Sequence, residues 1–466
     1  MLQLDAIESL LLCHLKTEKV WPKGDKQKWT LKYSKFGGRG LFAKCDIQRG
    51  EVIFIDKSLL RGPRCYDKYL PMCVNCFKSD CTLFPCDNCC GLPVCSDECE
   101  KSTTHVDREC QYLRNLQPTC GTMWCMDLLK VVILIQSLTL CQYQKDLIAI
   151  LQCHKGPRFG CDEIELLEKN VAKNVEKSDR EFMLRLSRIL DTNAFETAAL
   201  TGGKLTSLRG LFPLGAFLNH CCVPNARHYF DKHGMMVVRA AVPIPKGEEI
   251  MLAYTDFFWP TSLRWKYLKM TKQFECSCFR CLDSTELDST LSALKCIDEK
   301  CVGYLLPDDP LDLESFWTCH KCMKKISFLQ ANAIRLQIKE TVKEVLRKSH
   351  KEVLSFIESE LIHLVPLTNY VTLDLKFQIV SYFGRIDDLP WKDLTNEELD
   401  FKAKYCNDLI LVLDRLTGGD SQKKGLENTP HFQRNDKLAL SNSLRIIVHK
   451  KRTASTTIIP TGEIKN

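Results

Sequence analysis

The chain has 466 residues, of which 45% are hydrophobic and 26% are charged, and its formal net charge is +7. These proportions are typical of a folded globular protein and exclude a chain that is disordered throughout. The length predicts about two to four domains, and the mild charge does not require a nucleic-acid partner.

The N-terminal residues predict a short helix over Met1–Leu15 that carries Asp5 and Glu8. A signal peptide needs basic residues before an apolar run, and this segment lacks them. The most apolar stretch, Leu128–Leu140, is interrupted by Lys130 and is too short to span a bilayer. We therefore expect an intracellular protein, in nucleus and cytoplasm, without membrane contact.

Alternation of apolar and polar residues over Trp29–Ser34 predicts a strand, and Glu51–Ile55 reads as another strand. The segment Met72–Cys110 is dense in cysteine and lacks apolar periodicity, which predicts a small module that metal holds together. Apolar residues recur at helical spacing through Cys120–Thr201, which predicts a mostly helical segment.

Beyond Leu211 the pattern changes to antiparallel strands, with strands predicted over Met236–Val242 and Glu249–Tyr254. Helical spacing returns between Ile334 and Leu364, and one more helix is predicted over Leu409–Leu416. After Gly418 the sequence is polar and weakly patterned, which predicts a loosely ordered tail.

The 27 cysteines are the most unusual feature, and their spacing favours zinc over disulfides. The first cluster of cysteines lies between Cys73 and Cys110 and offers eight ligands, with His105 among them. These eight would make two closed tetrahedral sites, because thiolates and imidazole suit Zn²⁺. The alternative is a set of buried free cysteines. Our hypothesis for the pairing is interleaved: Cys73, Cys76, Cys95 and Cys99 on one ion, and Cys86, Cys89, His105 and Cys110 on the other. Cys81 and Cys90 compete for places in this assignment.

Two further clusters follow. The sequence Cys276-x-Cys278-x2-Cys281 offers three ligands, so a fourth must come from elsewhere, and Cys222 is a candidate. The last cluster predicts a ribbon-like four-cysteine site made by Cys296, Cys301, Cys319 and Cys322. In total we expect three to four structural zinc ions.

Four segments follow one another along the chain in an order that indicates a known family: Gly38-Arg39-Gly40-Leu41-Phe42-Ala43, Asn193-Ala194-Phe195, Asn219-His220-Cys221-Cys222-Val223-Pro224-Asn225, and Gly247-Glu248-Glu249-Ile250 leading to Tyr254. Together with the cysteines at 276–281 they resemble the SET methyltransferases. The cysteine module inserted after the first segment resembles a MYND finger. The whole arrangement is similar to the SET-and-MYND (Smyd) proteins, in the form of an arthropod-like member.

The resemblance implies an α+β fold, in which small antiparallel sheets and a pseudoknotted chain form a SET core that is split by a MYND zinc finger. It adds a helical insert, a post-SET zinc site and a helical C-terminal domain similar to tetratricopeptide repeats. The boundaries we expect are 1–28 for an N-terminal helix, 29–65 and 201–256 for the SET parts, 66–112 for the MYND finger, 113–200 for the insert, 257–285 for the post-SET segment, 286–325 for the extra zinc site, 326–420 for the helical domain and 421–466 for the tail.

The resemblance also implies the chemistry: a methyl group passes from S-adenosylmethionine to a lysine amine of a protein, and all zincs are structural. The residues that would hold the cofactor are Gly38, Arg39, Gly40, Asn193, Asn219, His220, Tyr254 and Phe274, and Tyr254 would be catalytic. Cys222 would complete the post-SET zinc site. Taken singly, Tyr254 could be an ordinary strand aromatic and Asn193 an ordinary end of a helix.

This sequence departs from the family at several places, which include the end of the chain after Gly425. Val94 stands where an aromatic residue is common, the gap from His105 to Cys110 is one residue longer than usual, and Lys272 replaces an expected tyrosine. The main hypothesis is an active lysine methyltransferase that acts on a histone or another protein and regulates transcription, and Lys272 counts against it. The alternative is an adaptor without turnover that binds proline-containing peptides through its MYND finger. A nucleic-acid binder is the least supported hypothesis, and we expect a monomer.

Overall fold

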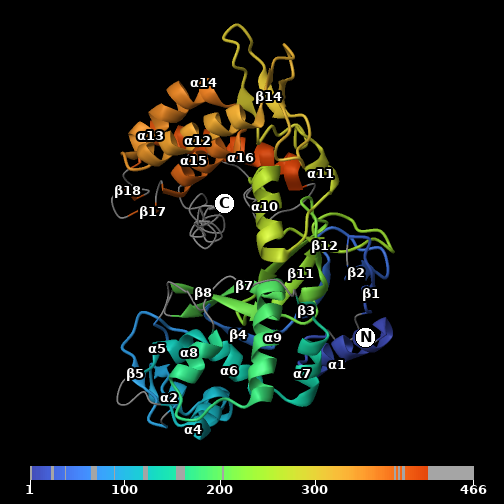
Figure 1. Ribbon diagram of the computed structural model, residues 1–466, viewed down its shortest axis with the longest axis vertical. Helices are drawn as coiled ribbons and strands as arrows, with labels where there is room; N and C mark the ends of the chain where they lie inside the picture. The colour runs from blue at the N-terminus through green and yellow to red at the C-terminus, as the bar shows by residue number, and fades with distance from the viewer. Residues whose placement is uncertain are drawn as a thin grey trace. The chain divides into compact units, whose positions relative to one another are not determined.

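The computed structural model describes residues 3–21, 26–36, 38–64, 71–88, 90–118, 124–153, 163–201, 204–382, 385–386, 389–390 and 394–417 (Figure 1). The chain divides into two compact units. The first unit contains Met1–Asn219 and His228–Ile250, and the second contains His220–Arg227 and Met251–Asn466. The tail predicted at 421–466 lies outside the described residues.

The first unit begins with helix α1 (Leu4–Thr17), which buries Ile7, Leu11 and Leu15. These residues recur at helical spacing, so they form one apolar face. Strands β1 (Trp29–Tyr33) and β2 (Arg39–Ala43) then pair antiparallel, with Trp29 opposite Ala43 and fully buried. The predicted N-terminal helix and the predicted strand over Trp29–Ser34 are both confirmed.

Two small three-stranded sheets form the centre of this unit. In one, β11 (Met236–Ala240) lies between β3 (Val52–Asp56) and β10 (Ala226–Phe230). In the other, β8 (Lys204–Leu211) lies between β4 (Leu60–Gly62) and β7 (Phe195–Thr201). Small antiparallel sheets of this kind agree with the α+β fold class predicted from the sequence.

The segment Phe195–Thr201 was expected to be helical, and this expectation is wrong. Helix α9 (Lys177–Asn193) ends at Asn193, and Ala194 is already extended with φ −69° and ψ 141°. The following residues then pair antiparallel with β8, starting with Phe195 opposite Gly210. Pairing with a strand that follows later in the chain overrides the local helical pattern.

The cysteine-rich module contains short elements only: β5 (Phe84–Pro85), β6 (Pro93–Val94), α2 (Asp97–Glu100), α3 (Thr103–His105), the π-helical turn η1 (Val106–Cys110) and α4 (Gln111–Leu116). The side chain of Ser96 caps α2 by accepting a hydrogen bond from the Cys99 backbone N–H. The shortness of these elements agrees with a module that burial alone cannot stabilise.

The helical insert contains α5 (Met126–Lys130), α6 (Val132–Leu138), α7 (Gln142–Ala149), α8 (Glu163–Lys169) and α9. Residues Val132–Ser137 of α6 are all buried, and α6 packs against α9 and β4. This burial explains why the stretch is so apolar. Among the described residues, none of the helices has the length and apolar character needed to cross a membrane.

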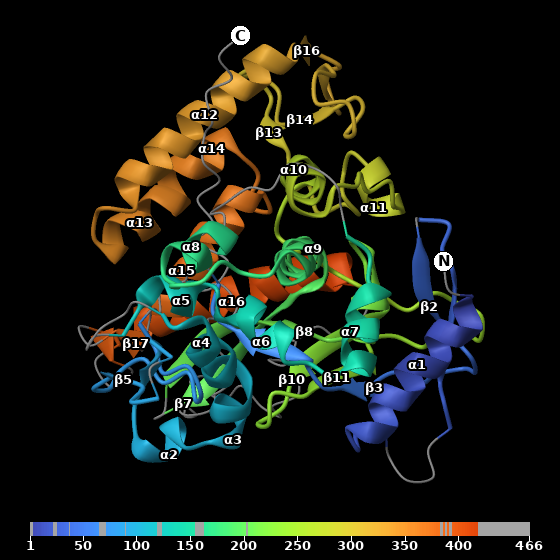
Figure 2. The same ribbon diagram turned by 60° about the horizontal axis from the view of Figure 1, so that its bottom comes forward.

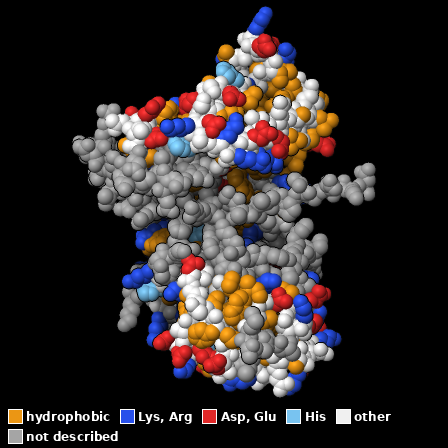
Figure 3. Space-filling view, turned by 90° about the vertical axis from the view of Figure 1, so that its left-hand side faces the viewer, with side chains coloured by type: hydrophobic (Ala, Val, Ile, Leu, Met, Phe, Trp, Pro, Cys, Tyr) orange, Lys and Arg blue, Asp and Glu red, His pale blue; other side chains and the backbone are white. Residues whose placement is uncertain are grey.

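The second unit contains the post-SET elements β12 (Met251–Leu252), α10 (Thr261–Lys272) and α11 (Phe279–Leu282). The strand predicted over Glu249–Tyr254 is therefore shorter than expected. Four strands then form an antiparallel ribbon: β13 (Leu294–Lys295), β14 (Tyr304–Pro307), β15 (Trp317–Cys319) and β16 (Lys325–Ile326). Hydrophobic side chains lie among charged ones on the surface at this end of the unit (Figure 3), where Phe316 and Met323 are exposed.

Helices complete the second unit: α12 (Phe328–Val345), α13 (His350–Phe356), the π-helical turn η3 (Ile357–Leu361), α14 (Ile362–Leu364), α15 (Tyr370–Tyr382) and α16 (Asn396–Thr417), with the short strands β17 (Arg385–Ile386) and β18 (Leu389–Pro390) between the last two. Figures 1 and 2 both show α12, α13 and α14 side by side. Ser327 and Ser349 begin α12 and α13 with capping boxes. The predicted helices are confirmed, although the last one begins at Asn396 rather than near Leu409.

Candidate functional site

The two glycines of the Gly38–Gly40 segment, at the start of β2, stand where an added side chain would be strained or would clash. Gly38 has φ +68°, a left-handed conformation that favours glycine. A Cβ on Gly40 would lie 2.8 Å from Asn219 Nδ2 and even closer to Glu249 Oε1. The lack of a side chain at Gly40 therefore lets Asn219 and Glu249 lie directly against the backbone.

Asn219 is held in one orientation by its neighbours. Its Nδ2 donates to Glu249 Oε1 at 2.7 Å and to the carbonyl oxygen of Arg39 at 3.3 Å. The other carboxylate oxygen of Glu249 accepts a hydrogen bond from Ser34 Oγ at 2.8 Å, and Glu249 is only 7% exposed. Because the Asn219 NH2 group donates to a carboxylate oxygen of Glu249, this contact fixes which way the Asn219 amide points.

Arg39 and Asn193 both bind the segment Ile150–Gln152, which no motif in the sequence had indicated. Arg39 Nη2 donates to the Ile150 carbonyl oxygen at 2.6 Å, and Asn193 Nδ2 donates to the Gln152 carbonyl oxygen at 2.7 Å. A second bond from Asn193 Nδ2 reaches the Ile189 carbonyl oxygen at 2.9 Å, inside its own helix. In the structure Asn193 therefore joins the end of α9 to this loop.

In the second unit, His220, Tyr254 and Phe274 form an aromatic cluster. The ring of His220 lies 5.2 Å from that of Tyr254 and 5.9 Å from that of Phe274, measured between centroids. The backbone N–H of Tyr254 donates to His220 Nδ1 at 3.0 Å. Burial lowers the pKa of His220 to about 3, so the imidazole is neutral at physiological pH.

Lys272 lies beside this cluster as the last residue of α10. Its Nζ is 5.7 Å from the centroid of the Tyr254 ring, which is within the range of a cation–π contact. The residue that departs from the family pattern is therefore placed against the predicted catalytic tyrosine, and it puts a positive charge there.

Cys222, Cys276, Cys278 and Cys281 come together, as the sequence suggested, and all four are buried. The sulfur of Cys222 lies 3.9 Å from that of Cys276 and 3.5 Å from that of Cys281. Four sulfurs at 2.3 Å from a tetrahedral zinc are about 3.8 Å apart, so this cluster fits a zinc ion.

Two buried arginines and a buried glutamate surround these thiols. Arg264 donates through Nε to Cys222 Sγ at 3.2 Å and through Nη2 to Cys281 Sγ at 3.4 Å. Its Nη1 pairs with Glu286 Oε2 at 2.5 Å, and Arg280 Nη2 lies 3.3 Å from the same oxygen. With zinc bound to four thiolates, the two guanidinium groups would offset negative charge that the ion leaves uncompensated.

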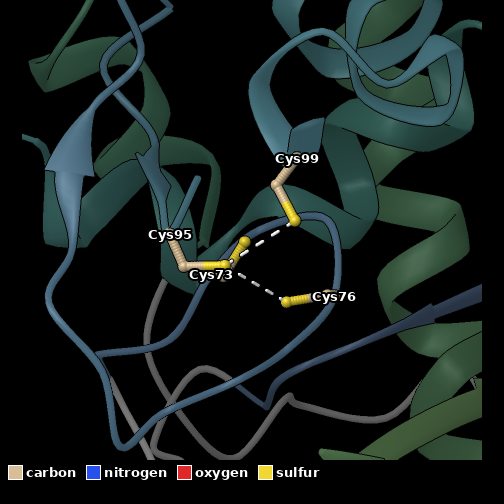
Figure 4. Close-up of side chains that lie close together, drawn as sticks. All are labelled: Cys73, Cys76, Cys95 and Cys99. Carbon is tan, nitrogen blue, oxygen red and sulfur yellow. Dashed lines mark hydrogen bonds between the residues drawn. The ribbon is translucent and has the colours of Figure 1, made fainter. Parts of the chain in front are cut away.

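In the cysteine-rich module, Cys73, Cys76, Cys95 and Cys99 point toward one another from separate segments (Figure 4). The sulfurs of Cys76 and Cys95 are 3.5 Å apart, and those of Cys95 and Cys99 are 3.6 Å apart. The structure therefore brings together the same four residues that the interleaved hypothesis placed on one ion.

The second group of the module consists of Cys86, Cys90, His105 and Cys110, all buried. Cys89, which the hypothesis placed here, lies outside the described residues, and its competitor Cys90 stands in this group. His105 Nε2 is 3.4 Å from Cys86 Sγ and 3.8 Å from Cys90 Sγ. The group offers the three sulfurs and one imidazole nitrogen of a closed zinc site.

The long gap from His105 to Cys110 has a structural explanation. The residues after His105 form the π-helical turn η1, in which hydrogen bonds join residues five apart rather than four. This turn brings His105 and Cys110 together across one additional residue. His105 Nδ1 also lies 2.8 Å from Glu109 Oε1, so the carboxylate holds the ring with Nε2 facing the sulfurs.

The last cluster, Cys296, Cys301, Cys319 and Cys322, lies at one end of the ribbon. The sulfurs of Cys296 and Cys322 are 3.5 Å apart, and those of Cys301 and Cys319 are 3.7 Å apart. Cys322 is exposed whereas Cys319 is buried. With this cluster the described residues hold four groups that fit zinc, the upper end of the predicted three to four.

Comparison with known proteins agrees with this geometry. Residues 38–255 match the model of the SET domain family. The SET domain-containing protein SmydA-8, isoform A, of Drosophila melanogaster is 34% identical over 418 residues, which cover 86% of this chain and 87% of the relative. This chain belongs to the Smyd family. Other relatives of this Smyd chain are named Histone-lysine N-methyltransferase: ASHR1 of Arabidopsis thaliana is 28% identical over 61% of this chain and 62% of its own length, and SMYD3 of Homo sapiens is 25% identical over 54% and 61%.

Sequence reasoning missed several residues that position the site of this Smyd chain. Glu249 lies within the segment Gly247–Ile250 that resembles the SET family, but this motif gave no reason to assign it a partner. Glu109 precedes Cys110 directly, a signal that could have indicated an outer partner for His105. Arg264 lies in a helix between two motifs and had no signal, because its partners are distant in sequence.

Proposed function

We propose that this Smyd protein is an S-adenosylmethionine-dependent protein-lysine N-methyltransferase. It acts on lysines of histones or other proteins, in nucleus and cytoplasm, and takes part in transcriptional regulation. The observation that carries the proposal is the placement of Tyr254, whose backbone is bound by His220 and whose ring lies in a cluster with that histidine. The names of the Arabidopsis and human relatives support the same reaction.

Each unit presents residues that fit an S-adenosylmethionine site by their chemistry. In the first unit the bare backbone at Gly38 and Gly40 and the fixed amide of Asn219 suit a polar ligand. In the second unit Phe274 offers an aromatic face beside His220. When bound, this cofactor supplies a methyl group on a positively charged sulfur.

The chain's own residues have to deliver a neutral lysine amine, although free lysine has a pKa of about 10.4. Partial burial of the amine beside Tyr254 and Phe274 favours its neutral form, because burial disfavours charge. The amine would have to lose its proton to solvent before it could accept the methyl group that the cofactor would supply. The Tyr254 hydroxyl would orient the amine, and this alignment is the larger contribution to the rate.

Lys272 favours the second candidate function, an adaptor with little or no turnover. Its ammonium group stands 5.7 Å from the Tyr254 ring, where it repels the positive charge of an incoming lysine. In that case the MYND finger would carry the function by binding proline-containing peptides, with the chain acting as a monomer. The two candidates share a cofactor site and differ in turnover.

The first test is a calorimetric titration of the zinc-loaded protein with S-adenosylmethionine. The Asn219→Ala variant removes the amide that Glu249 orients, and Asn407→Ala, at an exposed position on α16, is the matched control. We expect binding to the wild type and to the control, and weakened binding to Asn219→Ala. A folded, zinc-loaded wild type that does not bind the cofactor would rule out the methyltransferase.

A further inference from the structure

We propose that the zinc-bound thiolate of Cys222 positions the predicted catalytic tyrosine through the side chain of His220. His220 would then be a positioning residue, which transmits the geometry of the post-SET zinc site to the backbone of Tyr254. The inference rests on the proposed function for the role of Tyr254, but the hydrogen-bonded chain itself can be tested without turnover.

The contacts of His220 decide which of its two ring nitrogens carries the proton. A neutral imidazole has one protonated nitrogen and one bare nitrogen. His220 Nδ1 lies 3.0 Å from the backbone nitrogen of Tyr254, and a backbone N–H can only donate. Nδ1 is therefore the bare nitrogen, and the ring proton is on Nε2.

The proton on His220 Nε2 has the sulfur of Cys222 as its hydrogen-bond acceptor. Nε2 lies 3.2 Å from the sulfur of Cys222, so its N–H points at the sulfur. The same sulfur accepts from Arg264 Nε, also at 3.2 Å, and a guanidinium group can only donate. Zinc binds cysteine as the thiolate, so with zinc in this four-cysteine cluster the Cys222 sulfur would be a thiolate that accepts from both N–H donors.

Burial leaves little room for water to replace these hydrogen-bond partners. His220 is 6% exposed, Cys222 is 1% exposed and Arg264 is fully buried. A buried polar group that loses its partner pays a full desolvation penalty, so the ring keeps this orientation while the thiolate is present. The Cys222 sulfur, the His220 imidazole and the Tyr254 backbone thus form one continuous path within the second unit, which bound zinc would anchor at the sulfur.

The direct test is nuclear magnetic resonance of protein whose histidines carry the heavy nitrogen isotope, with cadmium in place of zinc. His220→Gln assigns the signal, and His363→Gln, at an exposed position of α14, is the matched control. We expect His220 to be protonated at Nε2 and to show scalar coupling from that proton to the metal across the sulfur. Protonation at Nδ1, a doubly protonated ring, or a signal without coupling to the metal would overturn the proposal.

The functional test compares two substitutions in zinc-loaded protein. His220→Phe keeps an aromatic ring against Tyr254 and Phe274 but removes both hydrogen bonds, whereas His220→Gln can still donate and accept. We expect His220→Phe to keep its zinc and to lower kcat up to about a hundredfold, with a smaller change in the KM of the lysine substrate and partial rescue by Gln. An unchanged kcat in His220→Phe would overturn the positioning role, whereas a wild type that transfers no methyl group would refute the proposed function instead.

Discussion

Glu286 offers a sharp test of how the post-SET zinc site is stabilised. It is 1% exposed, and its Oε2 accepts from Arg264 at 2.5 Å and from Arg280 at 3.3 Å, while both guanidinium groups are fully buried. Oε1 accepts from the Thr261 backbone N–H and from Ser292 Oγ. The substitution Glu286→Gln keeps the shape and removes the carboxylate charge that both arginines contact.

Removal of one partner from a buried ion pair typically costs about 3–5 kcal/mol, because an uncompensated charge stays buried. Each kcal/mol shifts the melting temperature of a domain of this size by roughly 2–4 °C, so we expect Glu286→Gln to melt roughly 6–20 °C lower than the wild type. The matched control is Glu275→Gln. Glu275 Oε1 lies 2.7 Å from Nζ of Lys269, which is on the same helix α10 as Arg264, and both side chains of this pair are exposed. An exposed pair contributes at most about 1 kcal/mol, so this variant should melt close to the wild type.

The assay is thermal unfolding of zinc-loaded protein, followed by the fluorescence of its tryptophans, with zinc content measured for each variant. If Glu286→Gln melted within a few degrees of Glu275→Gln, at equal zinc content, the buried network would not hold the post-SET segment as we describe.

Three further predictions concern metal and cofactor. Native mass spectrometry should find four zinc ions per chain, and Cys322→Ser should lose one of them; a wild type with two or fewer would contradict the assignment of the four clusters. Glu109→Gln should weaken zinc at the His105 site by roughly tenfold to a hundredfold in a chelator competition, because an amide orients the imidazole less well than a carboxylate; equal affinity would show that Glu109 has no such role. Gly40→Ala should weaken S-adenosylmethionine binding in a calorimeter, since the new Cβ displaces the Asn219 amide, and unaltered affinity would show that the Gly38–Gly40 segment does not face the cofactor.

The zinc clusters were predictable because ligand spacing is a local property of the sequence. Pairs such as Cys73-x2-Cys76 and Cys319-x2-Cys322 place two sulfurs on one tight turn, and the structure brings each pair to one group. The place of Cys90 in the His105 group was not predictable, because two adjacent cysteines at nearly the same spacing from Cys86 compete for it in the sequence.

The features that the sequence did not reveal depend on contacts between distant residues. Arg264 and Glu286 are 22 residues apart, and neither lies in a recognisable motif. The strand at Phe195–Thr201 likewise depends on its pairing with β8, which local periodicity does not record. Lys272 shows the converse: the sequence identified it as a departure, and the structure shows what it contacts.

The central claim is that this Smyd protein transfers methyl groups to lysine by means of Tyr254. The most direct measurement is transfer of a labelled methyl group from S-adenosylmethionine to core histones, with the wild type and Tyr254→Phe compared at equal cofactor occupancy. The account predicts label on histone lysines with the wild type and at least about a hundredfold slower labelling with Tyr254→Phe. Equal labelling of histone lysines by the wild type and by Tyr254→Phe would contradict it.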